Sequence, residues 1–294
     1  MSNISLSLSN KLPAEQVDII RHVVRAAENH RLRLFIVGAQ ARDLLLQYVY
    51  DLPVHRATND IDFGIIVESW DEFTKLREDL IINKGFDPYR TMTQRLVHAS
   101  GLVIDLVPFG ELEEVRGQIS WPPDFSIVMS TVGFREAYDD SVEVRVTGDL
   151  IVKVASLAGL ALMKIVAWDD RRFERDAQDL GLIMRNYLAA GNEDRIYNEH
   201  GDCFDLLDEE FDYEKSSARI LGRDIGHLLT DSSRQIVARA LSHEADQAGV
   251  DVLAIVMIRS RASYYGDHDV VMRMLAELRV GISENGLLGR MQVK

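Results

Sequence analysis

The first half of the chain alternates short apolar runs with segments of helical period. Strand-length runs rich in β-branched residues lie at 32–37, 60–67, 95–98 and 102–107, and two alternating runs follow at 142–146 and 150–154. Between them, apolar residues recur at helical spacing after Pro13 and again after Ser69, which is a residue type that favours helix starts. This pattern predicts a β-sheet flanked by helices.

From Ser156 onward the pattern is helical. Apolar residues recur at helical spacing from Leu157 to about Asp169, and further amphipathic segments follow at 220–229, 236–248, 250–258 and 270–280. We therefore expect an α+β protein with two domains. Residues 1–155 would hold the sheet, and residues 156–294 would form an α-helical bundle.

Two aspartates begin the predicted strand at 60–67. Side chains alternate between the two faces of a strand, so Asp60 and Asp62 share one face while Ile61 and Phe63 point to the other. Two carboxylates this close repel each other unless a cation lies between them. A hard divalent ion such as Mg²⁺ prefers carboxylate oxygens. The alternative is a capped turn with solvated aspartates, which is the common explanation of an isolated Asp-x-Asp.

Two further features favour a site at this strand. The apolar run 32–37 leads directly into Gly38, and a segment of helical composition that includes Ala39 and Arg42 follows. Glycine lets the backbone approach a ligand closely, and a strand–glycine–helix arrangement can bind a phosphate. Asp105 lies in the apolar run 102–107, where a charge is costly unless it is paired or bound to a metal. A turn at Ser100 and Gly101 would bring Asp105 beside Asp60 and Asp62.

A charged group also interrupts the first helix of the second domain. Lys164 falls on or beside its apolar face, so either its stem covers that face while the ammonium group reaches water, or its charge serves a function. Asp176 and Asp179 are three residues apart and face the same side of the next helix. They would orient Lys164, contact a nucleotide sugar or help to activate the acceptor hydroxyl; the alternative is that they stabilise the first turn of their helix.

Together, Gly38-Ala39, Asp60-x-Asp62, Asp105, Lys164 and the 175–180 segment resemble the motifs of the DNA-polymerase-beta-type nucleotidyltransferase superfamily, in its AbiEii/AbiGii toxin-like (MenT-like) branch. The resemblance extends over roughly residues 30 to 185 in order and spacing. One position departs from the pattern, because the superfamily usually has Gly-Gly or Gly-Ser where this chain has Gly38-Ala39. The missing hydroxyl removes one phosphate contact and leaves the acidic residues unaffected.

The resemblance implies a nucleotidyltransferase fold, with a mixed sheet flanked by helices, whose C-terminal helices complete the nucleotide site. It implies transfer of a nucleoside monophosphate from an NTP to an acceptor hydroxyl, on a tRNA 3′ end or a protein, with an antitoxin as partner. Mg²⁺ or Mn²⁺ would be the cofactor. The implied metal ligands are Asp60, Asp62 and Asp105; the implied catalytic residues are these three with Lys164 and Asp176; the implied nucleotide-binding residues are Gly38, Ala39, Arg42, Lys164 and Asp179.

Composition restricts the partners and the cellular compartment that we expect for this protein. The net charge of −14 argues against broad, unspecific nucleic-acid binding, which needs a positive surface. The single cysteine, Cys203, excludes a disulfide within the chain and favours a reducing compartment. The N-terminus lacks the features of a secretory signal, and no apolar stretch has the length of a membrane span. We expect a cytoplasmic protein that does not enter a membrane.

Other functions remain open from the sequence. A small-molecule nucleotidyltransferase of the antibiotic-modifying kind suits the acidic net charge better than an RNA-modifying enzyme does. A non-catalytic nucleotide-binding module with the same fold is an alternative from another class, although three retained aspartates argue against a decayed site. A metal-dependent hydrolase or nuclease is a weaker choice.

Overall fold

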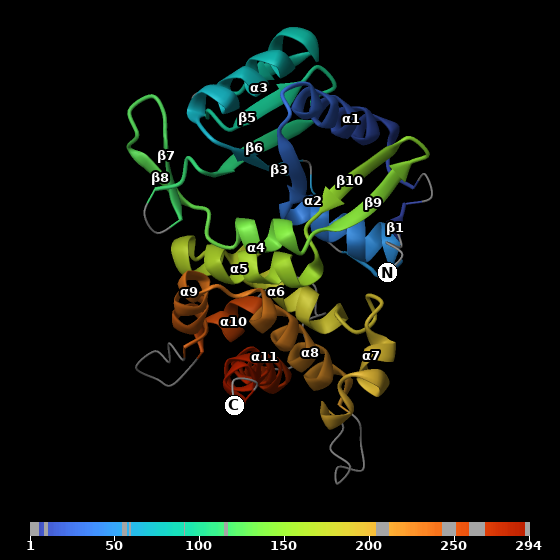
Figure 1. Cartoon of the computed structure of the whole chain (residues 1–294). Coiled ribbons are helices and arrows are strands. Elements are labelled where there is room, and N and C mark those ends of the chain that lie inside the picture. The colour runs from blue at the N-terminus through green and yellow to red at the C-terminus, as the bar shows by residue number, and fades with distance from the viewer. Residues whose placement is uncertain are drawn as a thin grey trace. The chain divides into compact units, whose positions relative to one another are not determined.

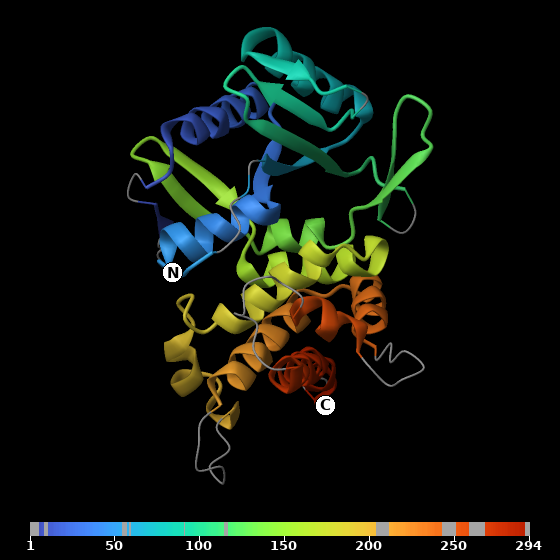
Figure 2. The same ribbon diagram turned by 180° about the vertical axis from the view of Figure 1, so that it is seen from behind.

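The chain forms two compact units, Met1–Ser156 and Leu157–Lys294 (Figures 1 and 2). The structure is a computed structural model that describes residues 6–8, 11–54, 58, 60–90, 92–114, 117–203, 212–242, 251–258 and 268–291, with side chains as far as residue 284. Within these residues, no helix combines the length and the hydropathy needed to cross a bilayer.

The first unit is built on an eight-stranded mixed sheet with the strand order β1-β9-β10-β2-β3-β6-β5-β4. At its centre, β3 runs antiparallel to β2 and parallel to β6, and β5 continues the sheet antiparallel to β6. The strands are β1 (Leu6–Ser7), β2 (Arg33–Val37), β3 (Asp60–Val67), β4 (Phe86–Pro88), β5 (Arg95–His98), β6 (Val103–Gly110), β9 (Val142–Thr147) and β10 (Leu150–Val154). A separate hairpin pairs β7 (Gln118–Trp121) with β8 (Ile127–Ser130).

Helices cover this sheet. Two long helices, α1 (Ala14–Asn29) and α3 (Trp70–Asn83), pack against each other and contact the sheet, as Figure 1 shows. The Ser69 side chain accepts a hydrogen bond from the Glu72 backbone N–H and so caps α3 as the sequence predicts. The shorter helices are α2 (Gly38–Asp43), which continues as the π-helix η1 (Leu44–Val49), and α4 (Phe134–Asp139).

The two faces of the central strands bury different side chains. Ile61, Phe63 and Ile65 alternate onto one face of β3, where all three are buried. On the opposite face, Phe35 and Phe109 pack edge-on at 5.8 Å between ring centroids, and Phe35 lies 5.4 Å from the ring of Tyr138 on α4. Asp60 and Asp62 alternate onto this second, aromatic face. The sheet therefore fixes the direction of both carboxylates.

The predicted fold class is confirmed, and the predicted strands and helices of this unit form with small shifts at their ends. The predicted end of one strand was wrong. Pro108 and Phe109 do not end β6; they pair with Ile65 and Ile66 of β3. Pairing of β5 with β6 stops at Asp105, so beyond that point β6 has an open edge where proline has no ladder hydrogen bond to lose.

The sequence prediction also missed several short elements, including β1, β4, β7, β8, α4 and α7. For example, β7 lies in the segment 111–124, whose sequence predicts a loop. These elements are short, so too few regularly spaced apolar residues distinguish them from the surrounding turns.

The second unit is entirely helical in the part that the structure describes. Its elements are α5 (Leu157–Arg171), α6 (Glu174–Asn186), α7 (Glu193–Asn198), the 3₁₀-helix η2 (Gly201–Cys203), α8 (Tyr213–Leu228), α9 (Asp231–Leu241), α10 (Val252–Ile258) and α11 (His268–Met291). Gly222 on α8 faces Gly281 on α11 so closely that a Cβ on Gly222 would lie 2.4 Å from the Leu278 carbonyl oxygen. Helices at this separation need glycine at the crossing point.

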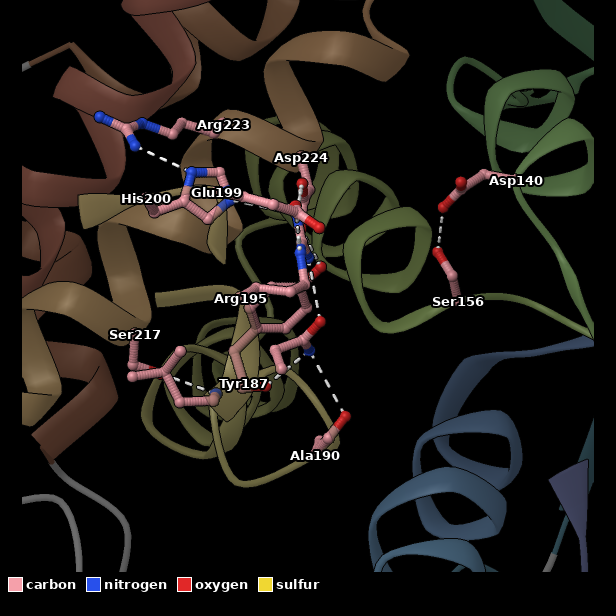
Figure 3. Close-up of polar contacts among 12 residues, drawn as sticks. Asp140, Ser156, Tyr187, Ala190, Arg195, Glu199, His200, Ser217, Arg223 and Asp224 are labelled. Atoms are coloured by element: carbon pink, nitrogen blue, oxygen red, sulfur yellow. Dashed lines mark hydrogen bonds and ion pairs between the residues drawn. The ribbon is translucent and has the colours of Figure 1, made fainter. Parts of the chain in front are cut away.

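A partly buried polar network connects α6, α7 and α8 (Figure 3). Arg195 donates to both carboxylate oxygens of Asp224 at 2.7 Å, and the Tyr187 hydroxyl donates to the same carboxylate at 2.5 Å. Burial, and then the Asp224 charge, raise the pKa of Tyr187. His200 lies between Arg195 and Arg223, and burial followed by these two positive charges lowers its pKa. The network holds the short helix α7 against α8.

Candidate functional site

The structure brings three carboxylates together on adjacent strands. In the parallel ladder of β3 and β6, Asp62 lies directly opposite Asp105, and Asp60 is two residues before Asp62 on the same face. One oxygen from each of Asp60, Asp62 and Asp105 lies within 4.8 Å of the other two, and all three residues are half-buried. We call these three residues the carboxylate triad.

The triad fits a hard divalent cation. Three negative groups in this volume repel one another, and oxygen atoms are the ligands that Mg²⁺ and Mn²⁺ prefer. The Thr58 hydroxyl donates to Asp60 at 2.6 Å, which restricts the orientation of that carboxylate. The ligand roles of the triad stay a prediction, and the donor set agrees with them.

Arg95 contacts two members of the triad. Arg95 lies opposite Asp105 in the antiparallel ladder of β5 and β6, and its Nε and Nη2 donate to the two oxygens of Asp105 at 2.8 and 2.5 Å. Its Nη2 also lies 3.4 Å from Asp60 Oδ2. Hydrogen bonding to Asp105 is the largest cause that raises the pKa of Arg95. The sequence offers Arg95 as a candidate triphosphate contact or, more commonly, a surface arginine; its pairing with Asp105 became evident only with the register of the hairpin.

The Gly38 backbone lies directly against the Asp62 side chain. It has a φ of 69°, in the left-handed region, and a Cβ on this residue would lie 2.0 Å from Asp62 Oδ2. Only glycine permits this turn and this carboxylate position together. Ala39 follows in the first turn of α2 and is half-buried.

Arg42, expected near the nucleotide, is only 1% exposed. Its guanidinium group donates to Asp43 Oδ1 from Nε and Nη2 at 2.7 and 2.5 Å. This buried ion pair keeps the charge inside the first unit. Its nucleotide-binding role stays a prediction.

The second group of predicted residues forms a buried ion cluster within the helical unit. Lys164 Nζ on α5 lies 3.1 Å from Asp176 Oδ1 and 2.7 Å from Asp179 Oδ2, and both aspartates are on α6. Arg171 donates to both oxygens of Asp176, at 2.7 and 2.9 Å. Burial raises the pKa of Asp176, but the Arg171 hydrogen bonds and the Lys164 charge together outweigh burial and lower it.

The cluster connects the two helices electrostatically. Asp176 is fully buried, Asp179 is 3% exposed and Lys164 is 9% exposed, so each charge depends on its partners for stabilisation. Asp176 and Asp179 do share one side of α6, as their spacing predicts. The expectation that these aspartates orient Lys164 is consistent with these contacts, whereas the contact of Lys164 with a nucleotide stays a prediction.

We expect Lys164→Met to lower the free energy of unfolding of the helical unit by ~3 kcal/mol, because it leaves two buried carboxylates with too little positive charge. The matched control is Lys215→Met on α8, where the salt bridge to Asp212 is more than one-third exposed on both sides. That variant should lose at most ~0.5 kcal/mol. Urea denaturation followed by circular dichroism measures both. Equal, small losses would mean that the Lys164 cluster is solvated.

The family model described as "Nucleotidyl transferase AbiEii toxin, Type IV TA system" matches residues 44–248, which is more than half of the chain. The matched region begins after Gly38 and contains the carboxylate triad and the Lys164 cluster. A search of curated proteins gave no match.

Several solved structures are similar at low identity. The antibiotic-resistance factor ANT(2'')-Ia is 15% identical, with a TM-score of 0.39, over 65% of this chain and 92% of that chain. JHP933 from Helicobacter pylori is 11% identical, with a TM-score of 0.38, over 96% of this chain and 98% of that one. The CCA-adding enzyme of Thermotoga maritima, complexed with tRNA, is 12% identical, with a TM-score of 0.27, over 95% and 84%.

Structural similarities with TM-scores this low do not support conclusions about this chain. Its family is therefore assigned from the family model alone. That match agrees with the motifs read from the sequence and includes every residue of the triad. The chain belongs to the AbiEii nucleotidyl transferase toxin family of type IV toxin–antitoxin systems, and it is a nucleotidyltransferase.

Proposed function

We propose that the protein transfers a nucleoside monophosphate from an NTP to the terminal hydroxyl of a tRNA, with the carboxylate triad as its catalytic centre. The observation that carries the proposal is the convergence of three carboxylate oxygens within 4.8 Å beside the Gly38 turn, in a chain of this family. Asp60, Asp62 and Asp105 would hold the divalent ion, which when bound neutralises charge on the phosphates and the attacking oxygen.

The reaction is an in-line displacement. The acceptor hydroxyl oxygen forms a bond to the α-phosphorus, the bond from this phosphorus to the α,β-bridging oxygen breaks, and pyrophosphate leaves with that electron pair. We assign Asp105 to receive the hydroxyl proton, since it lies on the same face as Asp60 and Asp62. Gly38 and Ala39 provide backbone that can approach the phosphates, and Lys164, oriented by Asp176 and Asp179, neutralises phosphate charge.

An exposed turn between α5 and α6 supports RNA over a protein acceptor. The guanidinium carbons of Arg171 and Arg175 lie 5.3 and 5.2 Å from the centre of the Phe173 ring, which is 49% exposed. Arginines stacked on an aromatic ring can contact both phosphates and unstacked bases. The segment 169–176 holds three arginines and four acidic residues, so stacking of an unpaired base on the Phe173 ring, and not net positive charge, is the feature that favours an RNA end here.

A small hydroxylated acceptor is the second candidate, and the same net charge favours it. The family description further suggests that the protein acts as the toxin of a pair and is opposed by an antitoxin.

The acceptor is tested by incubating the protein with Mg²⁺ and α-phosphate-labelled NTPs in the presence of total RNA, total protein or aminoglycosides. We expect the label to enter the tRNA fraction, with release of unlabelled pyrophosphate. Label in protein or in a small molecule would contradict the RNA acceptor while leaving nucleotidyl transfer intact. If pyrophosphate is released but no label enters RNA or protein, neither tRNA nor a protein is the acceptor.

The catalytic centre is tested by Asp62→Asn, which keeps the shape of the side chain and removes its charge. We expect a normal circular dichroism spectrum and a loss of pyrophosphate release by a factor of ~100 or more, because electrostatic stabilisation of the transferred phosphate depends on this group. Asp87→Asn on the exposed part of β4 is the matched control and should be fully active. An active Asp62→Asn enzyme would refute the assignment.

Gly38→Ala tests the role of the turn. The new Cβ would displace the Asp62 carboxylate, so we expect pyrophosphate release to fall ~100-fold, as a misplacement of about 1 Å at a catalytic group can cause. Gly101→Ala is the control, because Gly101 also has a positive φ, of 89°, but a Cβ there would meet no atom within 4 Å. If the two variants lose activity equally, backbone strain rather than the carboxylate position explains the effect.

A further inference from the structure

Arg95 holds both oxygens of one triad member. Its two donor nitrogens lie 2.8 and 2.5 Å from the two oxygens of Asp105, which is a bidentate pair, and the same guanidinium group reaches Asp60 at 3.4 Å. The side chains are 25% exposed for Arg95 and 14% exposed for Asp105, so water screens this pair only partly. The pair is therefore a strong internal interaction of the triad.

The same oxygens are those that a divalent ion would use. A carboxylate in a bidentate arginine pair has committed one lone pair on each oxygen, in the plane of the group. An ion at the triad would take its remaining lone pairs and would lie close to the guanidinium charge, which repels it. Arg95 and the ion therefore compete for Asp105, both sterically and by charge.

The positive charge of Arg95 determines whether this residue raises or lowers the affinity of the triad for a divalent ion. Removing Arg95 takes one positive charge away from the three carboxylates, which makes the local charge more negative and more attractive to a divalent ion. The Tyr89 ring, 5.8 Å from the guanidinium carbon, offers Arg95 a cation–π contact that does not depend on Asp105.

We propose that Arg95 is an internal counter-ion that stabilises the triad when no divalent ion is bound and that lowers its affinity for the ion by competing for Asp105. Occupation of the site is then coupled to loosening of the Arg95–Asp105 pair. Arg95 is a positioning residue in this scheme, and the inference rests on the metal site of the proposed function.

The test is calorimetric titration of Mn²⁺ into the full chain without nucleotide, comparing the parent protein with Arg95→Ala. We expect Arg95→Ala to bind Mn²⁺ ~10-fold more tightly or better, the size of effect that one neighbouring charge has on a carboxylate equilibrium. Arg95→Lys, which keeps the charge and loses the bidentate geometry, should lie between the two.

Two controls separate this role from a general structural one. Arg90→Ala removes a neighbouring arginine that stacks on the same Tyr89 ring, and it should leave Mn²⁺ affinity unchanged. In thermal melts without metal, Arg95→Ala should melt below the parent protein, and saturating Mn²⁺ should raise its melting temperature by more than that of the parent. A purely structural role would lower the melting temperature without tightening Mn²⁺ binding.

These experiments distinguish an error in the role of Arg95 from an error in the proposed function. Unchanged or weaker Mn²⁺ binding by folded Arg95→Ala, with the parent protein binding normally, would overturn the competition alone. Absence of Mn²⁺ binding in every variant would overturn both the inference and the metal site on which it rests. Tighter binding by Arg95→Ala in a protein that releases no pyrophosphate from any NTP would support the inference and contradict the proposed reaction.

Discussion

Repulsion among three carboxylates is the constraint around which the first unit is arranged. The register of β3 and β6 forces Asp62 and Asp105 to be direct neighbours, and the alternation of β3 adds Asp60 on the same face. Such an arrangement is unfavourable without positive charge. The hydrogen bonds of Arg95 provide part of that charge, and a divalent ion is suited to provide the rest.

The surrounding structure holds these carboxylates in place despite their repulsion. Gly38 allows the chain to turn tightly against Asp62, and the Phe35, Phe109 and Tyr138 rings anchor the same face of the sheet in the core. Burial of the apolar side chains on one face of β3 fixes its register, because a slip of one residue would carry the aspartates to that face. The polar site therefore depends on the apolar core for its geometry.

The helical unit contains its own charged cluster, and it is stabilised differently. Lys164 and Arg171 together balance Asp176 and Asp179, so four buried or partly buried charges nearly cancel. Removing any one partner leaves a charge that burial penalises, which makes the cluster sensitive to substitution even where it touches no ligand. Sensitivity of Lys164 to mutation would therefore need a separate stability measurement before it was read as catalysis.

The sequence by itself determined the succession of elements and most of the residues discussed here. Period-2 and helical patterns predicted β2, β3, β5, β6 and the helical second half, and the spacing of Asp60 and Asp62 predicted their common face. These features are local, since they depend on residues a few positions apart. Short or atypical elements, such as α4, β7 and the proline-containing end of β6, gave too little local signal to be predicted.

Contacts between distant residues were decided only by the tertiary structure. The pairing of Arg95 with Asp105 is set by strand register, and the distances from Lys164 to Asp176 and Asp179 are set by helix packing. A charged residue has the same appearance in a sequence whether it is solvated, paired or bound to a ligand. Its electrostatic state depends on which groups the fold brings within a few ångströms, and that information is absent from the residue and its neighbours in the chain.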